Sequence, residues 1–276
     1  ILGATGDLTR RLLLPALDGV LAQLESAGVD TELELIGAGH SDEGADDWNE
    51  MVASTLGEGA LRDQTRSGAR FESVDATSVD DLRRVIESAA HPPILYFALP
   101  PAITEKAVEA LASITLPKGT RLALEKPFAR DLDSAASLNE RLAALAPESC
   151  IHRVDHFLAK STVVNLLGLR FANRMFEAVW NAEHIARIEI VYDETLALEG
   201  RAGYYDQAGA LVDMIQSHLL LVHALVVMEQ PATLDAGDLH DAMAEALAAT
   251  ELQQGDSATA SRRARYTAGS IDGKDI

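Results

Sequence analysis

The chain has 276 residues, of which 47% are hydrophobic and 24% are charged, as in ordinary globular proteins. Its 23 Lys and Arg against 43 Asp and Glu give a net charge of −20, which repels nucleic acid backbones and anionic lipid. No apolar run approaches the roughly 20 residues of a membrane span, and the single cysteine, Cys150, excludes an intrachain disulfide. We therefore expect a soluble protein of one or two domains, with neither nucleic acid nor membrane as a partner.

The first half of the chain alternates short apolar runs with amphipathic segments. The apolar runs, bounded by turn residues, predict strands over 32–38, 70–74, 94–98, 121–125 and 150–154. Apolar residues three and four apart predict helices over 13–24, 79–90, 104–112 and 132–144. This alternation is typical of a doubly wound parallel sheet, so we expect an α/β dinucleotide-binding domain over 1–154.

After residue 154 this alternation stops. The sequence predicts a long helix, a strand over 185–192, apolar helices over 209–227 and 237–248, and a polar loop over 253–262. We expect 155–276 to begin a second domain of α+β character. The chain starts at Ile1 without Met and stops after a strand-like stretch, so we also expect a longer protein.

Two glycines stand where the first strand must turn into the first helix, in the segment Gly3-Ala4-Thr5-Gly6-Asp7-Leu8. Glycines there let backbone N–H groups approach a pyrophosphate at the positive end of a helix. A plain strand-to-helix turn is the alternative, but the alternating architecture favours a dinucleotide site. At the end of the second strand, where a carboxylate would select NAD or an arginine NADP, the chain has His40 and Ser41.

Two further positions suggest an anion or sugar site. Lys126 follows a strand at the carboxyl edge of the sheet, where it can hold a sugar hydroxyl or be an ordinary surface lysine. His156 and Lys160 are four residues apart, so on a helix they share one face, either as an anion clamp or as a solvated surface. A metal site from His152, Asp155 and His156 lacks a further ligand.

Several segments, in this order, resemble the glucose-6-phosphate dehydrogenase family. They are Gly3-Ala4-Thr5-Gly6-Asp7-Leu8, Phe97-Ala98-Leu99-Pro100-Pro101, Glu125-Lys126-Pro127-Phe128, Arg153-Val154-Asp155-His156-Phe157-Leu158, Leu169-Arg170-Phe171-Ala172-Asn173-Arg174, Glu199-Gly200-Arg201-Ala202-Gly203-Tyr204-Tyr205 and Asp213-Met214-Ile215-Gln216-Ser217-His218. The resemblance implies a Rossmann domain followed by a truncated α+β domain with a mostly antiparallel sheet, to which 185–192 would belong. It also implies a cytoplasmic enzyme that forms a homodimer or a dimer of dimers.

The resemblance further implies hydride transfer from the anomeric carbon of glucose 6-phosphate to NADP or NAD, giving 6-phosphogluconolactone at the entry to the pentose phosphate pathway. His218, which by itself is more often read as a core or interface histidine, matches the general base, and Asp155 matches its carboxylate partner; the pair needs no metal. Substrate-binding positions are His156, Lys160, Lys126, Glu194 and Asp213. Cofactor-binding positions are Gly3, Thr5, Gly6, Asp7, Leu8, His40, Ser41, Pro100 and Lys126.

The chain departs from the family pattern at four positions. Phe157 replaces a tyrosine whose hydroxyl reaches the phosphate, Leu12 replaces a lysine of the substrate site, and Ser217 replaces an asparagine before the base. His40 replaces the arginine that often selects NADP, so we expect relaxed cofactor choice or a shift toward NAD. The alternatives are a dehydrogenase of another sugar or sugar phosphate, and a non-catalytic cofactor-binding homologue.

Overall fold

The computed structural model describes residues 1–40, 44–126, 128–129, 131–193, 205–206, 209–252, 257–265, 267, 269–271 and 274–275. Two predicted site residues, Ser41 and Glu194, lie outside the described residues. The chain divides into two compact units, Ile1–Val154 (unit 1) and Asp155–Ile276 (unit 2). Each unit has a hydrophobic core of its own.

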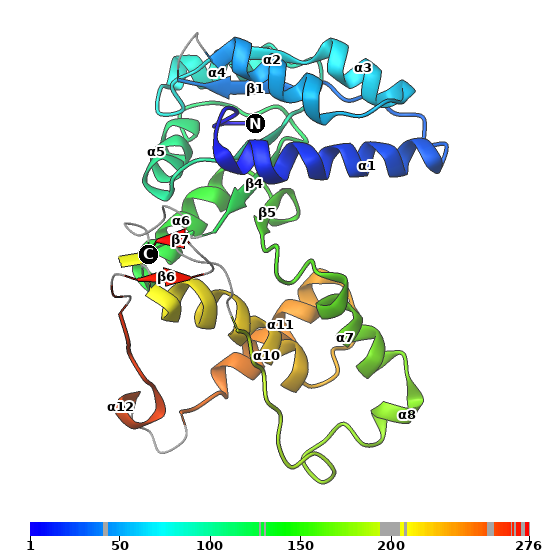
Figure 1. The fold of residues 1–276 in the computed structure, drawn as a ribbon, viewed down its shortest axis with the longest axis vertical. Helices are drawn as coiled ribbons and strands as arrows, with labels where there is room; N and C mark the ends of the chain where they lie inside the picture. Colours follow the sequence, from blue (N-terminus) through cyan, green and yellow to red (C-terminus); the bar gives the residue numbers. More distant parts are fainter. Residues whose placement is uncertain are drawn as a thin grey trace. The chain divides into compact units, whose positions relative to one another are not determined.

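Unit 1 is built on a parallel sheet (Figure 1). Its strands are β1 (Ile36–Gly39), β2 (Arg70–Ser73), β3 (Ile94–Phe97), β4 (Arg121–Glu125) and β5 (Ile151–Val154). β1 pairs with β2, β4 lies between β3 and β5, and Leu2 forms parallel bridges to Ala38 of β1 and Phe97 of β3. With Leu2 as the first strand, the order across the sheet is third, second, first, fourth, fifth, sixth, which is a doubly wound order.

The predicted α/β fold of this half is confirmed, and every predicted strand has a counterpart. The largest difference is at the first of them, which begins at Ile36 and not at residue 32. The neighbouring strand β2 starts at Arg70, opposite Ile36, so residues 32–35 have no strand beside them with which to pair.

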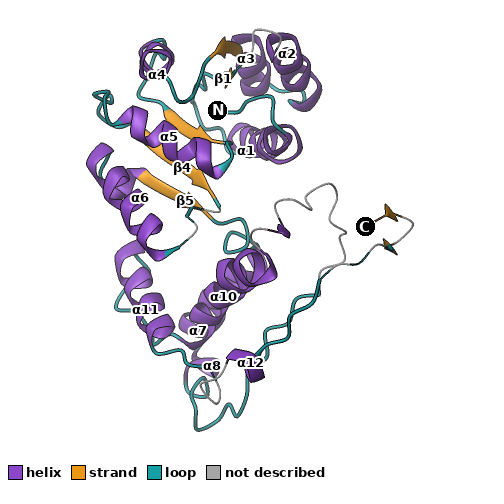
Figure 2. Cartoon of the chain, turned by 90° about the vertical axis from the view of Figure 1, so that its left-hand side faces the viewer, coloured by secondary structure: helices purple, strands orange, loops and turns teal. Residues whose placement is uncertain are grey.

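Helices cover both faces of this sheet (Figure 2). They are η1 (Thr9–Leu13), α1 (Leu14–Ser26), α2 (Gly44–Thr55), α3 (Ala60–Gly68), α4 (Val79–Glu87), α5 (Pro101–Leu111), α6 (Leu132–Leu145) and the short η2 (Glu148–Cys150). α1, α2 and α3 pack in one hydrophobic cluster around Leu14, Leu21 and Trp48. α4, α5 and α6 pack with the strands in a second cluster that includes Phe97 and Leu122.

The contact of α2 with the sheet depends on Gly37. A Cβ atom there would lie 2.6 Å from the indole ring of Trp48, which is fully buried. Because glycine has no side chain, the largest residue of α2 can lie directly over strand β1. This close contact holds α2 against the sheet at strand β1.

Unit 2 is mainly helical in the part that the structure describes. Its elements are α7 (Ser161–Phe171), α8 (Arg174–Glu177), η3 (Leu211–Leu219), α10 (Leu220–Val227), α11 (Ala236–Ala248), α12 (Ser257–Ala260) and the antiparallel pair β6 (Ser270–Ile271) and β7 (Lys274–Asp275). α7, α10 and α11 share a small hydrophobic cluster that includes Val163, Leu225 and Met243.

A buried arginine joins two of these helices. Arg170 of α7 donates from Nη1 to the carbonyl of Leu225 and from Nη2 to the carbonyl of Met228, both at 2.6 Å. These carbonyls lie at the end of α10, where a helix carries unpaired acceptors and partial negative charge. Trp180 adds a third bond, from its indole nitrogen to the carbonyl of Val226 at 2.9 Å. Polar contacts therefore hold the end of α10 against the α7 side of the unit.

Two predictions for unit 2 are wrong in the structure. Residues 185–192 form no strand, because no other strand lies beside this extended segment within the described residues. Arg187 and Glu189, two residues apart, pair at 2.7 Å on an exposed surface instead. The predicted loop over 253–262 contains the short helix α12.

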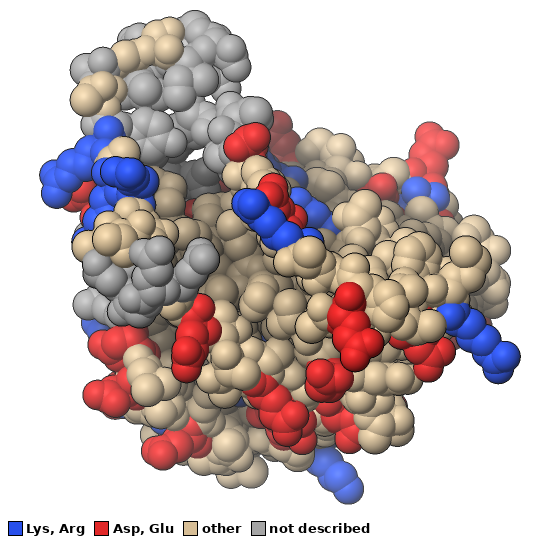
Figure 3. Space-filling model, turned by 90° about the horizontal axis from the view of Figure 1, so that it is seen from below, with Lys and Arg blue, Asp and Glu red and all other residues tan. Residues whose placement is uncertain are grey.

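The net charge is visible on the surface. Acidic side chains are spread over the face shown in Figure 3, with fewer basic side chains between them. Within the described ranges, no helix is long and apolar enough to cross a membrane.

Candidate functional site

The glycine-rich loop lies at the carboxyl end of the Leu2 strand, between the ends of β1 and β3. Gly3 has a φ of +84°, and a Cβ atom there would lie 2.2 Å from the carbonyl oxygen of Ala98. Its N–H donates to the carbonyl of Ala38 at 2.9 Å. The loop therefore passes so close to both neighbouring strands that only glycine fits at this position.

The rest of the loop leads directly into a helix. Gly6 donates its N–H to the carbonyl of Gly3 at 3.1 Å, and the buried hydroxyl of Thr9 donates to the same carbonyl at 3.1 Å. The first N–H groups of a helix have no partner inside it and lie at its positive end, which suits an anion. The backbone around Thr5, Asp7 and Leu8 is therefore where the sequence predicts the pyrophosphate of a dinucleotide.

Other predicted cofactor residues follow the neighbouring strands at the same edge of the sheet, because all strands of unit 1 are parallel. His40 follows β1, Pro100 precedes α5 after β3, and Lys126 follows β4. Beside Lys126, the carboxylate of Glu125 accepts a hydrogen bond from the hydroxyl of Tyr96. Burial, together with that carboxylate, raises the pKa of Tyr96.

A carboxylate that the sequence analysis did not single out lies close to His40. Asp75 accepts hydrogen bonds from the N–H of Thr77 at 2.8 Å and from its hydroxyl at 2.7 Å, and these donors lower the pKa of Asp75. The imidazole of His40 lowers it further by a smaller amount. The sequence signal was the position of Asp75, directly after the predicted strand over 70–74.

In unit 2, the segment after β5 is a turn and not the helix on which the spacing argument for His156 and Lys160 relied. Oδ1 of Asp155 accepts from the N–H of Phe157 at 2.8 Å and from that of Leu158 at 3.2 Å. These bonds form a turn directly after strand β5. Asp side chains commonly stabilise turns by accepting from backbone N–H groups two or three residues ahead. α7 begins only after Lys160.

His218 of η3 lies beside this turn. Its Nδ1 is 3.8 Å from Oδ1 of Asp155, and only 7% of the His218 side chain and 11% of the Asp155 side chain are exposed. The distance allows electrostatic attraction but is longer than a hydrogen bond. Because Nδ1 faces the carboxylate, a proton on Nδ1 is favoured.

Aromatic contacts connect His218 with the predicted phosphate ligands. The His218 ring centroid is 4.6 Å from that of Phe157 and 4.9 Å from that of His156. Nζ of Lys160 lies 4.2 Å from the Phe157 centroid, in a cation–π contact, and the rings of Phe157 and Tyr192 meet in a T-shaped contact. A buried imidazole therefore sits next to two exposed basic groups, His156 and Lys160.

The structure brings the predicted residues together in two groups. Unit 1 gathers the loop residues with His40, Pro100 and Lys126 at one sheet edge, and unit 2 gathers Asp155, His156, Lys160 and His218. Asp213 lies on η3, five residues before His218.

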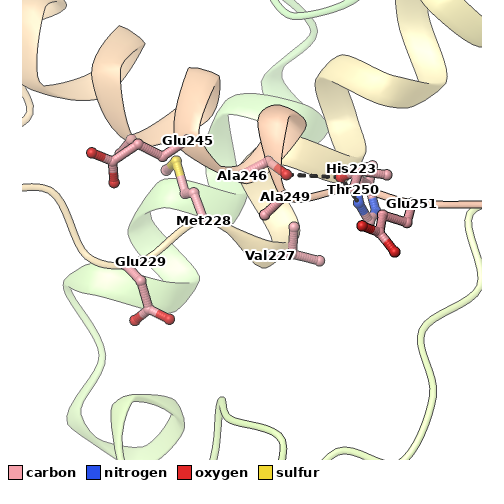
Figure 4. Close-up of a pocket in the computed structure, with 10 residues that line it drawn as sticks. His223, Val227, Met228, Glu229, Glu245, Ala246, Ala249, Thr250 and Glu251 are labelled. Atoms are coloured by element: carbon pink, nitrogen blue, oxygen red, sulfur yellow. Dashed lines mark hydrogen bonds between the residues drawn. The ribbon is translucent and has the colours of Figure 1, made fainter.

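One pocket of unit 2 contains none of these residues (Figure 4). It has a volume of about 520 Å³ and is lined by residues of α10 and α11 and those that follow them, among them His223, Glu229, Glu245 and Glu251. In the part of the chain that the structure describes, no three His, Cys, Asp or Glu side chains gather closely enough to hold a metal ion.

Family models, relatives and solved structures that match this chain point to one family. Residues 1–165 match the model described as "Glucose-6-phosphate dehydrogenase, NAD binding domain", and residues 167–276 match "Glucose-6-phosphate dehydrogenase, C-terminal domain". The glucose-6-phosphate 1-dehydrogenases of Rhizobium meliloti and Gluconobacter oxydans are 37% and 36% identical over the whole of this chain, which covers 58% and 59% of their lengths.

Two solved structures are similar as well. A glucose-6-phosphate dehydrogenase in complex with its substrate glucose-6-phosphate matches with a TM-score of 0.79 and 30% identity, over 91% of this chain and 55% of that one. The glucose-6-phosphate 1-dehydrogenase of Mycobacterium avium matches with a TM-score of 0.73 and 36% identity, over 88% and 55%. The chain thus spans a little over half the length of these relatives, and it belongs to the glucose-6-phosphate dehydrogenase family.

Proposed function

We propose that the protein is an NAD(P)-dependent glucose-6-phosphate 1-dehydrogenase. The observation that carries this proposal is the pair of buried His218 and half-buried Asp155, next to the exposed basic groups of His156 and Lys160. A proton acceptor beside an anion-binding rim suits a substrate that has a reactive hydroxyl and a phosphate. The matched relatives carry this name, and one of them was solved with this substrate.

The proposed chemistry is an oxidation at the anomeric carbon of the sugar. Nε2 of His218 takes the proton of the anomeric hydroxyl while the carbon loses a hydride, and the lactone carbonyl forms. Asp155 stabilises the imidazolium at 3.8 Å and keeps the other ring nitrogen protonated. Lys126, Glu194 and Asp213 are proposed to hold the sugar ring.

A nicotinamide cofactor fits unit 1. The close approach of Gly3 to the neighbouring strands and the helix start after Gly6 would receive the pyrophosphate, with Thr5, Asp7 and Leu8 around it. When bound, the nicotinamide ring accepts the hydride. Pro100 and Lys126 follow adjacent strands at that edge and are proposed to line the rest of the site.

We propose that the cofactor preference is relaxed or shifted toward NAD. His40 follows β1 and is close enough to Asp75 to lower the pKa of that carboxyl. An ionised carboxylate there repels a 2′-phosphate, and no permanent cation at position 40 offsets the repulsion. Steady-state kinetics with both cofactors tests this, and a hundredfold preference for NADP would contradict it. Ser41 is part of the same proposal but lies outside the described residues.

The decisive assay follows nicotinamide reduction by the intact protein with glucose 6-phosphate and each cofactor in turn. We expect turnover, with free glucose showing a much higher KM, and a loss of at least about a hundredfold in kcat for His218→Asn. An equally low KM for free sugars would favour a dehydrogenase of another sugar. Cofactor binding without reduction by any sugar or sugar phosphate would favour the non-catalytic homologue.

Two family properties stay predictions: a homodimer or dimer of dimers formed through the second domain, and a cytoplasmic location. The first is tested by the molar mass of the intact protein in solution.

A further inference from the structure

The helical segment that carries His218 has an unusual winding. η3 is a π-helix, and at its end the N–H of Leu220 donates to the carbonyl of Ile215, five residues earlier. α10 then continues from it without interruption. π-helical turns hold an additional residue compared with α-helical turns and are frequent at functional sites.

This winding changes which residues share a side of the helix. In an α-helix, residues five apart point about 140° away from each other, because 3.6 residues complete a turn. In a π-helix, residues five apart are joined by a hydrogen bond and share one side of the helix, as residues four apart do in an α-helix. Asp213 and His218 are five apart on η3, so the π winding turns Asp213 toward the side of the helix that carries His218, farther than an α winding would.

A side-chain bond follows the same spacing. The hydroxyl of the half-buried Ser217 donates to the carbonyl of Val212, five residues back, at 2.7 Å. A serine inside an α-helix usually bonds to the carbonyl four residues back. We propose that Ser217 is a positioning residue whose hydroxyl stabilises the π turn and thereby holds Asp213 and His218 on one face.

The inference rests on the proposed function, because that function uses both groups. A base that takes the proton of one sugar hydroxyl and a carboxylate that accepts a hydrogen bond from another must keep a fixed separation while the sugar is bound. In this chain both groups belong to η3, so the winding of that one helix sets the separation between Asp213 and His218. Among the described residues, the titratable groups placed against the His218 ring are Asp155 and His156, with Lys160 behind Phe157.

The first experiment compares Ser217→Ala and Ser217→Thr in the intact protein. Loss of the hydroxyl should relax the turn toward α winding and lower kcat for glucose 6-phosphate about tenfold, while threonine, which keeps a hydroxyl, should restore most of it. The matched control is Thr250→Ala, which removes a hydroxyl bonded at 2.7 Å to the carbonyl of Ala246, at the α spacing of four residues. It should leave kcat unchanged. Equal kcat for Ser217→Ala and wild type would overturn the proposal.

A second measurement does not depend on turnover. The pH titration of the His218 imidazole, followed by NMR and assigned with His218→Asn, should move in Ser217→Ala in the same direction as in Asp213→Asn, and stay unchanged in Ser217→Thr. An unchanged titration in Ser217→Ala would overturn the proposal whether or not the protein oxidises glucose 6-phosphate. Conversely, a moved titration in a protein without turnover would support the role of Ser217 and reject the proposed function.

Discussion

Different interactions stabilise the interior of each of the two units. Unit 1 has a sheet with a hydrophobic cluster on each face, whereas unit 2, as far as it is described, has one small cluster between α7, α10 and α11. Unit 2 compensates with polar contacts, above all the guanidinium of Arg170 at the end of α10. Burial of apolar surface is spread over many residues, but a buried cation concentrates stability in one side chain.

The difference suits the two proposed tasks. A dinucleotide needs a rigid sheet edge with backbone groups at fixed places, and the apolar cores of unit 1 supply it. A proton acceptor needs polar neighbours, and His218 has two of them, Asp155 and His156. Such a site leaves less room for apolar packing than the cores of unit 1.

Gly3→Ala should have the largest effect on unit 1. Its φ of +84° alone costs about 1–2 kcal/mol for alanine, and the clash of Cβ with the Ala98 carbonyl adds about 1–3 kcal/mol. Gly28→Ala is the matched control, because Gly28 has a φ of +66° but no atom within 4 Å of the added Cβ. Chemical denaturation followed by circular dichroism gives both values. Equal losses would show that the close approach at Gly3 costs nothing.

Arg170→Met should be the corresponding weak point of unit 2. It removes both donors from the carbonyls at the end of α10 and should lower the free energy of unfolding by about 2–4 kcal/mol. Arg187→Met is the control, since the Arg187–Glu189 pair is exposed and worth about 0–1 kcal/mol. If both variants unfold alike in denaturant, the buried guanidinium does not hold unit 2 together.

The acid stability of unit 1 should depend on carboxylates that join its elements. Burial acts to raise the pKa of Glu25, but the N–H groups of Arg62 and Leu61 and the Arg62 guanidinium outweigh it and lower the pKa. A lowered pKa contributes stability that is complete above the ordinary value of 4.5 and is lost as the pH falls below it. Glu25→Gln should therefore be less stable than wild type at pH 7, with a smaller difference near pH 3.

The comparison for this variant is Asp80→Asn, on a side chain that is 91% exposed. Thermal unfolding across the pH range should give this control the wild-type profile. A constant difference between Glu25→Gln and wild type at all pH values would exclude the carboxylate as the cause.

The smallest expected effect concerns Phe157. Phe157→Leu removes the cation–π contact with Lys160, worth about 0.5–1 kcal/mol, and should raise the KM for glucose 6-phosphate about two- to fivefold. Phe157→Tyr should lower that KM by adding a hydroxyl near the phosphate ligands. Phe176→Leu, in the exposed helix α8, is the control. An unchanged KM in Phe157→Leu would show that the ring does not hold Lys160 for the substrate.

The sequence predicted unit 1 better than unit 2 for a physical reason. Parallel strands are buried on both faces, so they read as apolar runs whatever their neighbours are. α3, by contrast, was not predicted, because few of its residues are apolar and its start depends on Glu25, a residue of α1 that caps it through the N–H groups of Leu61 and Arg62. Contacts between distant segments of this kind leave no local pattern.

The same reason explains the errors in unit 2. Residues 185–192 have the composition of a strand, but a strand also needs a partner, and composition does not show one. For the candidate site, the resemblance identified His218 and Asp155, and the structure adds what neither spacing nor resemblance contains: the turn at Asp155, the ring contacts of Phe157 and the π winding of η3. If this segment were assumed to be an α-helix with 3.6 residues per turn, Asp213 and His218 would be expected on different sides of it.

The placement of the two tryptophans has a practical consequence. Trp48, packed over Gly37, is fully buried in unit 1, and Trp180, bonded to the carbonyl of Val226 and lying near Arg170, belongs to unit 2. The chain has no other tryptophan, so each unit has its own intrinsic fluorophore. Emission from Trp48→Phe and Trp180→Phe variants would report separately on the nucleotide-binding half and on the half that carries the proposed base.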